Sequence, residues 1–129
     1  MKKIPLIAAA LIAMSTPAMA EGDIKAGKKV FKKCKACHSL KPGDNKVGPT
    51  LHNIIGAQAG MNPDFRYSKA MKDAELVWDV ETLAAFLTKP KDVVPRTSMA
   101  FNGLKKPEQV DDLIAYLQSE MDPEEAASE

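Results

Sequence analysis

The sequence predicts a small all-α domain with long connecting loops. Apolar residues recur at helical spacing in three stretches of the 129-residue chain, and no stretch shows the apolar–polar alternation of a half-buried strand. Segments rich in glycine and proline separate the helical stretches. The chain has no internal repeats and no coiled-coil heptads. We therefore expect a few helices packed as one domain.

The first helix is predicted between Gly22 and Lys33. Asp23 is its expected N-cap, and Ile24, Gly27 and Phe31 follow at helical spacing. Glycine inside a helix costs about 1 kcal/mol relative to alanine. Gly27 should therefore have a packing reason, and we expect the close approach of the last helix.

A long loop is predicted from Ser39 to Gly60, because prolines and glycines interrupt this stretch throughout. A structureless segment of this length is unusual inside a compact domain. The difficulty disappears if the loop wraps a large flat cofactor. After it, Ser68 can cap a short helix that runs through Asp73.

The next helix has a sharper signature. Asp79 is its expected N-cap, and Trp78 and Leu83 occupy the two positions of a hydrophobic staple. Pro90 should end the helix after Lys89, because the residue before a proline disfavours helical backbone.

The last helix is predicted after a loop that runs from Pro95 to Gly103. Pro107 suits the first turn of a helix. The apolar face of this helix consists of Val110, Leu113, Ile114 and Leu117.

The N-terminus has the pattern of a secretory signal peptide, residues 1–20. Met1 to Lys3 is positively charged, Ile4 to Met14 is apolar, and Ala18 to Ala20 is a small-residue cleavage site. The apolar run is too short for a membrane span, although an uncleaved anchor is the alternative. Removing 20 of the 129 residues leaves a mature chain of 109 that starts at Glu21. We expect export to a bacterial periplasm.

The charge of the mature chain is divided between a basic body and an acidic tail. Residues 120–129 hold five acidic residues and no basic one, so residues 21–119, the predicted folded domain, carry 16 basic and 12 acidic residues. The tail composition predicts a solvated, disordered end. No array of aromatic and basic residues suits nucleic acid.

The stretch Cys34-Lys35-Ala36-Cys37-His38 is the C-x-x-C-H pattern of c-type haem attachment. The two thiols can form thioether bonds to a haem, and the adjacent imidazole can then ligate the iron. A thioredoxin-type redox pair would need a βαβ setting. A zinc site would need four ligands, and only His52 could join these three.

An iron held by His38 needs a second axial ligand or an open face for chemistry. Four methionines survive maturation, namely Met61, Met71, Met99 and Met121. Met99 is best placed, in the loop between a proline and a glycine, although it could instead fill a gap in the core. A thioether favours ferrous iron and raises the reduction potential.

The residues from Gly27 to Leu117 resemble the class I cytochromes c, specifically the bacterial cytochromes c2 that look like mitochondrial cytochrome c. The matching residues are Gly27, Phe31, Cys34 to His38, Val47 to His52, Gly56, Gly60, Phe65 to Ser68, Trp78, Glu81 to Leu83, Pro90, Pro95 to Met99, Phe101, Gly103 and Asp112 to Leu117. The resemblance implies the small class I cytochrome c fold, in which N- and C-terminal helices cross and long loops wrap one covalently bound haem c.

The resemblance also implies a role for individual residues. Cys34 and Cys37 match the thioether anchors, and His38 and Met99 match the axial ligands of the haem iron. The carbonyl of Pro49 matches the group that accepts a hydrogen bond from the ligand histidine. The residues that match positions near the haem propionates are Tyr67, Ser68, Trp78 and Thr97.

Three positions depart from the mitochondrial pattern. Ala57 stands where those relatives have an arginine, Met71 where they have a buried asparagine, and Phe86 where many have a tyrosine. The effect of these three residues on haem tuning is left open by the sequence. Arg66 could replace the missing cation near a propionate.

With both axial positions filled, the iron would serve electron transfer and the protein would not be an enzyme. An enzyme or sensor in which Met99 leaves the iron, and a haem-free dithiol oxidoreductase, are the alternatives. Exposed lysines should steer a monomer toward acidic surfaces of membrane complexes, without insertion into the membrane. These lysines are Lys28, Lys29, Lys32, Lys33, Lys35, Lys46, Lys89, Lys91, Lys105 and Lys106. The resemblance implies a bc1-type donor and a terminal oxidase or photosynthetic reaction centre as acceptor.

Overall fold

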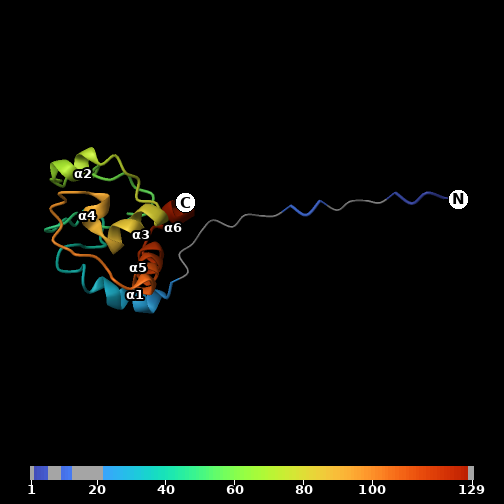
Figure 1. Cartoon of the computed structure of the whole chain (residues 1–129), viewed down its shortest axis with the longest axis horizontal. Coiled ribbons are helices and arrows are strands. Elements are labelled where there is room, and N and C mark those ends of the chain that lie inside the picture. The colour runs from blue at the N-terminus through green and yellow to red at the C-terminus, as the bar shows by residue number, and fades with distance from the viewer. Residues whose placement is uncertain (1, 6–9, 13–21, 128–129) are drawn as a thin grey trace.

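The computed structural model describes residues 2–5, 10–12 and 22–127 (Figure 1). Its helices are α1 (Ile24–Phe31), α2 (Lys69–Asp73), α3 (Val80–Thr88), α4 (Pro90–Val93), α5 (Pro107–Ser119) and α6 (Pro123–Ala127). In these residues the only β-type pairing is an isolated bridge between Gln58 and Val77. The predicted all-α class is therefore confirmed. The expected cleavage site after Ala20 and most of the signal segment lie outside the described residues.

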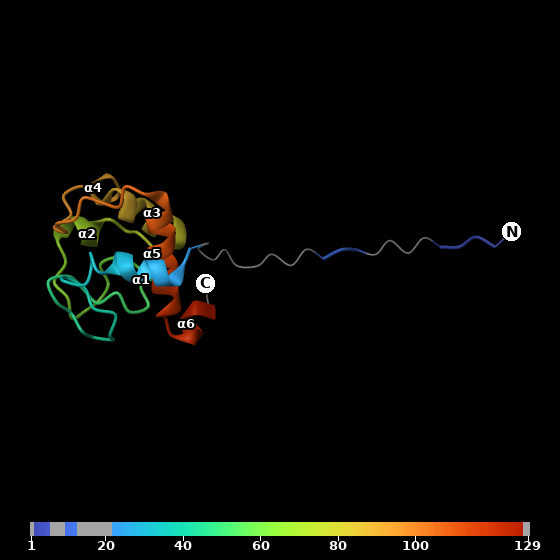
Figure 2. The same cartoon turned by 90° about the horizontal axis from the view of Figure 1, so that it is seen from below.

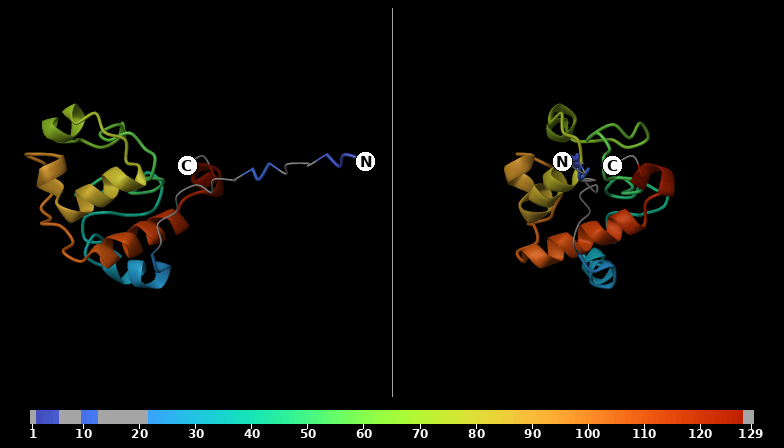
Figure 3. Two further views of the ribbon diagram at one scale, coloured as in Figure 1. Left: turned by 45° about the vertical axis from the view of Figure 1, so that its right-hand side comes forward. Right: turned by 90° about the vertical axis from the view of Figure 1, so that its right-hand side faces the viewer.

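Helices α1 and α5 cross, and the right-hand view of Figure 3 shows α1 nearly end-on beneath α5. A Cβ atom on Gly27 would lie 1.9 Å from the Asp112 carbonyl oxygen and 2.7 Å from Tyr116 Cβ. The rings of Phe31 and Tyr116 lie 5.6 Å apart, and Asp23 N–H donates to Asp112 Oδ1 at 2.8 Å. The predicted packing reason for Gly27 is confirmed.

Helix α3 packs against both α5 and α4, and this arrangement completes the helical framework (Figure 2). The predicted N-caps are present. Asp23 accepts from Ala26 N–H at 3.1 Å, Ser68 from Met71 N–H at 3.2 Å and Asp79 from Thr82 N–H at 2.7 Å. Each cap satisfies a backbone donor that the helix itself leaves unpaired. No helix in the described part of the chain is long and apolar enough to cross a membrane.

The structure has a short helix where the sequence predicted only a stop. Helix α3 ends at Thr88, and α4 begins directly at Pro90. The backbone of Lys89 between them leaves the helical region, with φ −148° and ψ 89°. A proline at the first position of a helix loses no hydrogen bond, so Pro90 both ends one helix and starts the next.

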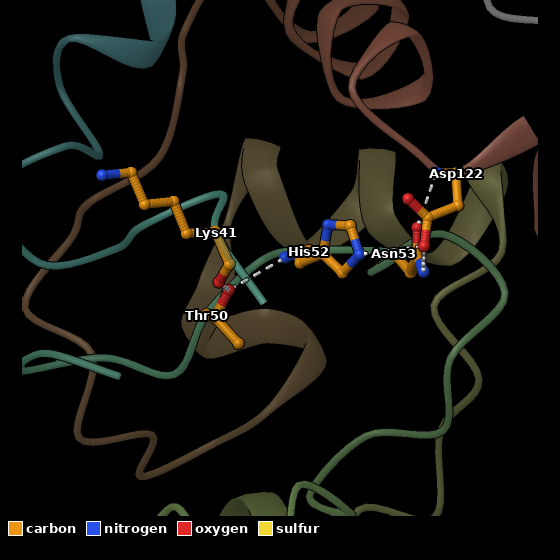
Figure 4. A network of polar contacts seen from close by, with 5 residues as sticks. All are labelled: Lys41, Thr50, His52, Asn53 and Asp122. Atoms are coloured by element: carbon orange, nitrogen blue, oxygen red, sulfur yellow. Dashed lines mark hydrogen bonds and ion pairs between the residues drawn. The ribbon is translucent and has the colours of Figure 1, made fainter. Parts of the chain in front are cut away.

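The first residues of the segment 120–129, for which the composition predicts a solvated tail, pack against the domain. Met121 is only 8% exposed and belongs to the core. Asp122 accepts hydrogen bonds from His52 Nε2 and Asn53 Nδ2, each at 3.1 Å, and its own N–H donates to Asn53 Oδ1 at 2.9 Å (Figure 4). Packing therefore continues to Asp122, because one apolar side chain and one carboxylate find partners that an averaged composition does not reveal.

Candidate haem site

A cavity of about 510 Å³ lies between the helices and the loops. Its volume is within the usual range for small-molecule and cofactor sites. Phe31 of α1, three residues of α3 and two residues of α5 contribute apolar walls. The lining residues that the sequence singled out are Cys34, Cys37, His38, Pro49, His52, Ala57, Met61, Tyr67, Ser68, Met71, Trp78, Phe86, Thr97 and Met99. The structure therefore brings together residues that lie more than sixty positions apart.

The Cys34-to-His38 segment continues from α1 as a run of turns. Cys37 N–H and His38 N–H both donate to the Cys34 carbonyl oxygen, at 3.1 and 2.9 Å. Cys34 is half-buried and Cys37 is exposed, and neither thiol forms a disulfide. The turns thus place both thiols and the imidazole at one wall of the cavity.

The surroundings of the Cys34 thiol disfavour its thiolate form. Burial and the neighbouring Cys37 raise its pKa to about 11, although Lys33 acts in the opposite direction. A reactive dithiol pair requires a thiolate with a lowered pKa. The Cys34 thiol does not have this property. Among the described residues, no three His, Cys, Asp or Glu side chains form a cluster that could hold a metal ion.

His38 is held in one orientation beneath the cavity. Its side chain is buried, and Nδ1 donates to the Pro49 carbonyl oxygen at 2.7 Å, the contact that the resemblance implied. Burial lowers the pKa of His38, against the opposing effect of this hydrogen bond. Neutral imidazole with a proton on Nδ1 keeps a lone pair on Nε2, which is the form that ligates a metal.

Gly48 makes this arrangement possible. A Cβ atom there would lie 2.4 Å from His38 Cε1, so no other residue could pass so close to the ring. Its N–H donates to the Cys37 carbonyl oxygen at 2.8 Å. The loop before Pro49 is thereby fastened to the attachment segment.

Of the four methionines after residue 20, Met61, Met71 and Met99 line the cavity, and Met121 does not. Met61 is 62% exposed, and Met71 lies on α2. Met99 is half-buried in the loop from Pro95 to Gly103, and its N–H donates to Thr97 Oγ1 at 3.3 Å. The ends of this loop are fixed, because Val94 is 1% and Leu104 is 2% exposed.

The four residues predicted near the propionates all line the cavity. Tyr67 Oη accepts from Asn62 N–H at 3.2 Å, which leaves the phenolic hydrogen free to donate elsewhere. Burial raises the pKa of Tyr67, so the phenol is protonated at neutral pH. Trp78 packs against Phe86, with ring centroids 4.9 Å apart.

The three departures from the mitochondrial pattern, Ala57, Met71 and Phe86, also line the cavity. Arg66 does not, and its side chain is exposed. The structure therefore does not support Arg66 as the replacement for the missing cation.

Two asparagines at this site are missed by sequence reasoning. Asn62 lines the cavity, and its Nδ2 donates to Asn45 Oδ1 at 3.0 Å. Asn45 lies in the loop that also carries Pro49, so this bond joins two walls. Proline and glycine punctuation indicates a loop there but contains no information about which loops meet.

The donor set fits haem c. Two thiols, a neutral imidazole and a thioether line one cavity whose remaining walls are mainly apolar, with hydroxyl and indole donors among them. A haem has the same character, since it combines an apolar ring with two carboxylates. Cys34 and Cys37 would hold it, and His38 and Met99 can supply the nitrogen and sulfur ligands typical of cytochromes c.

A family model described as cytochrome c matches residues 24–120. A cytochrome c2 of Rhodomicrobium vannielii is 48% identical over 119 residues, which cover 89% of this chain and 92% of the relative. A cytochrome c2 of Agrobacterium tumefaciens is 50% identical over 101 residues, which cover 75% of this chain and 91% of the relative.

The fold is similar to a solved structure of cytochrome cH from Methylobacterium extorquens. The TM-score is 0.72 at 45% sequence identity, and the match covers 76% of this chain and 99% of the other. Family, fold and cavity therefore agree. The chain belongs to the cytochrome c family and is a class I c-type cytochrome, an electron-transfer protein with covalently bound haem c.

Proposed function

We propose that this protein is a periplasmic one-electron carrier that shuttles electrons between membrane complexes. In this proposal Cys34 and Cys37 are the thioether anchors, and His38 and Met99 are the axial ligands. One observation carries it: an oriented imidazole and a thioether from a firmly anchored loop line the same cavity as the two thiols. Two protein ligands leave no iron position for a substrate, which favours electron transfer over catalysis.

Haem c, when bound, supplies an iron that accepts and releases one electron. The protein residues hold it and tune it. Pro49 orients His38 and increases its basicity through the hydrogen bond to Nδ1. Tyr67, Ser68, Trp78 and Thr97 form the polar part of the haem environment. The walls on α3 and α5 exclude water, and a fixed environment favours an electron transfer that needs little rearrangement.

The lysine set would steer the protein to acidic partner surfaces. All ten lysines named above as steering residues are exposed. Among the described residues, only Lys89 of these ten has a carboxylate within 4.0 Å. Uncompensated surface charge accelerates association with an oppositely charged partner and makes it dependent on salt. The partners in this proposal are a bc1-type donor and, as acceptor, a terminal oxidase or photosynthetic reaction centre.

Export is part of the same proposal. Residues 1–20 would be a cleaved signal peptide, residues 21–119 the cytochrome c domain and residues 120–129 an acidic tail, of which the segment to Asp122 stays packed. Fractionation of the source cells tests the location, and the mass of the mature protein tests cleavage before Glu21. A cytoplasmic protein that keeps residues 1–20 would contradict both.

The axial ligands are tested by the absorption spectrum of the oxidised protein at neutral pH. We expect the sulfur-to-iron charge-transfer band in the native protein and its loss in Met99→Ala. Met61→Ala is the matched control, because Met61 lines the same cavity but is largely exposed. A native protein that lacks the band and binds added cyanide rapidly would instead favour an enzyme or a sensor with an open iron position.

The partners are tested by turnover of membranes from the source organism, with and without the purified protein. We expect electron flow from the donor to the acceptor complex to depend on the protein and to slow as salt rises from 0.05 to about 0.2 M. Equal flow in its absence would remove it from this path.

A further inference from the structure

A chain of hydrogen bonds runs from the far wall of the cavity to His38. Asn62 Nδ2 donates to Asn45 Oδ1 at 3.0 Å, and Thr50 N–H donates to the same oxygen at 2.9 Å. The Thr50 nitrogen belongs to the peptide unit whose carbonyl, that of Pro49, accepts from His38 Nδ1 at 2.7 Å. Asn45 is therefore one peptide group away from the imidazole.

The peptide between Pro49 and Thr50 transmits orientation from Asn45 to His38. This peptide is trans, since the structure has no cis peptide bonds among the described residues. A trans peptide is planar, and its N–H and C=O point in opposite directions. When Asn45 Oδ1 fixes the N–H, it also fixes the direction of the carbonyl that holds the imidazole.

The same geometry transmits polarisation. A peptide whose N–H donates a hydrogen bond is a stronger acceptor at its carbonyl, because successive hydrogen bonds polarise one another. A stronger acceptor at Pro49 draws the Nδ1 proton of His38 and makes the ring a more basic ligand. A more basic ligand favours ferric iron and so lowers the reduction potential.

Asn45 is itself held in place. Its Nδ2 donates to the Asp64 carbonyl oxygen at 3.3 Å, and Asn45 is half-buried. With this donor engaged, Oδ1 is the atom that faces the two N–H groups, which agrees with their distances. Asn62 in turn donates from its backbone to Tyr67 Oη at 3.2 Å. The two walls are thereby joined through one amide.

We propose that Asn45 is a positioning residue for electron transfer, which sets the orientation and basicity of His38 through the Pro49–Thr50 peptide and couples them to the loop of Asn62. This inference rests on the proposed role of His38 as the proximal ligand. Asn45 does not line the haem cavity, and its side chain bonds to Thr50, Asn62 and Asp64, so it acts on His38 through the peptide.

The experiment compares the native holoprotein with Asn45→Ala and, as a matched control, Asn53→Ala. Asn53 also loses side-chain hydrogen bonds on truncation, but these go to Asp122. The readouts are the chemical shift and exchange rate of the His38 Nδ1 proton in the reduced, ¹⁵N-labelled protein, and the reduction potential. In Asn45→Ala we expect an upfield shift, exchange about fivefold faster and a higher potential. In Asn53→Ala we expect all three to match the native protein.

A second variant keeps the test decisive if Asn45→Ala does not fold. Asn45→Asp retains the acceptor atom and makes it a stronger acceptor, so the Nδ1 proton should move downfield. A folded variant, Ala or Asp, whose Nδ1 proton stays at the native shift overturns the inference. Failure of the proposed function is recognised separately, since the native protein would then lack covalent haem or the charge-transfer band.

Discussion

The α1–α5 crossing and the loops around the cavity are stabilised in different ways. At the crossing, helix backbones touch through Gly27, and residues such as Leu113 and Ile114 are 1% exposed. The loops between Ser39 and Ser68 bury fewer apolar side chains, among them Ile55, and rely more on polar contacts such as that from Thr50 Oγ1 to the Lys41 carbonyl oxygen at 2.6 Å. Buried apolar area is worth about 25 cal/mol per Å², whereas one hydrogen bond contributes about 1 kcal/mol net. The crossing should therefore form without haem, and the loops should need it.

The largest effect is expected from haem removal. The double variant Cys34→Ala, Cys37→Ala cannot anchor the haem, so the loops between Ser39 and Ser68 lose their main packing surface. Amide hydrogen exchange should accelerate there by about a hundredfold or more, and less in α1 and α5. Equal acceleration in both regions would show that the crossing also depends on the haem.

A second prediction concerns the crossing itself. Gly27→Val should destabilise the holoprotein by about 3 kcal/mol, because the new side chain meets the Asp112 backbone and a backbone cannot easily move aside. Guanidinium unfolding measures the change. Gly43→Ala is the control, since nothing lies within 4 Å of its Cβ position and only its φ of +69° opposes the substitution. Its cost should be about 1 kcal/mol, and a similar value for Gly27→Val would contradict the crossing geometry.

A third, smaller effect should appear where the C-terminal segment meets the loops. Hydrogen bonds from Asn53 and His52 lower the pKa of Asp122 below its ordinary value of 3.8. A lowered carboxyl pKa stabilises the folded segment above pH 3.8, and this contribution is lost as the pH falls through the lower folded value. Carboxypeptidase should remove the C-terminal residues of the native protein faster at acid pH than at neutral pH. At neutral pH it should remove them faster from Asp122→Asn than from the native protein.

The control for this prediction is Glu124→Gln, which removes the same charge from an exposed position on α6. It should leave the release rate near that of the native protein. If both variants behave alike, net charge rather than the contact to Asn53 and His52 holds the segment.

The smallest effect is expected from Arg66→Ala. A cation near a propionate disfavours ferric iron, so its loss would lower the reduction potential if Arg66 acted there. Because Arg66 is exposed and does not line the cavity, we expect no change in potential or in propionate titration. A clear fall in potential would restore its role.

The features that the sequence could predict are local. Rules that act within one or two helical turns predict the Asp79 cap and the need for a packing reason at Gly27. The structure contains the cap and the close helix approach at Gly27. The Cys34-to-His38 motif is contiguous, so it predicts haem without any knowledge of the fold. These features depend on local backbone chemistry.

The features that the sequence did not predict depend on contacts between distant segments. Asn45 and Asn62 meet across two loops, and Met121 is buried although its neighbours are acidic. The short helix α4 was missed because a proline both stops the helix before it and suits the first position of a new helix. No periodic pattern marks such contacts, since they occur once each.

The loop that carries Met99 has fixed ends, and its middle lines the cavity through Thr97 and Met99. Val94 and Leu104 are buried on either side, and Leu104 N–H donates to the Leu87 carbonyl oxygen at 2.8 Å. Gly103 closes the loop with a φ of +102° at a point where a Cβ atom would lie 2.0 Å from the Thr88 carbonyl oxygen. The stretch between Pro95 and Gly103 therefore has a fixed span, and its length sets where Met99 meets the cavity.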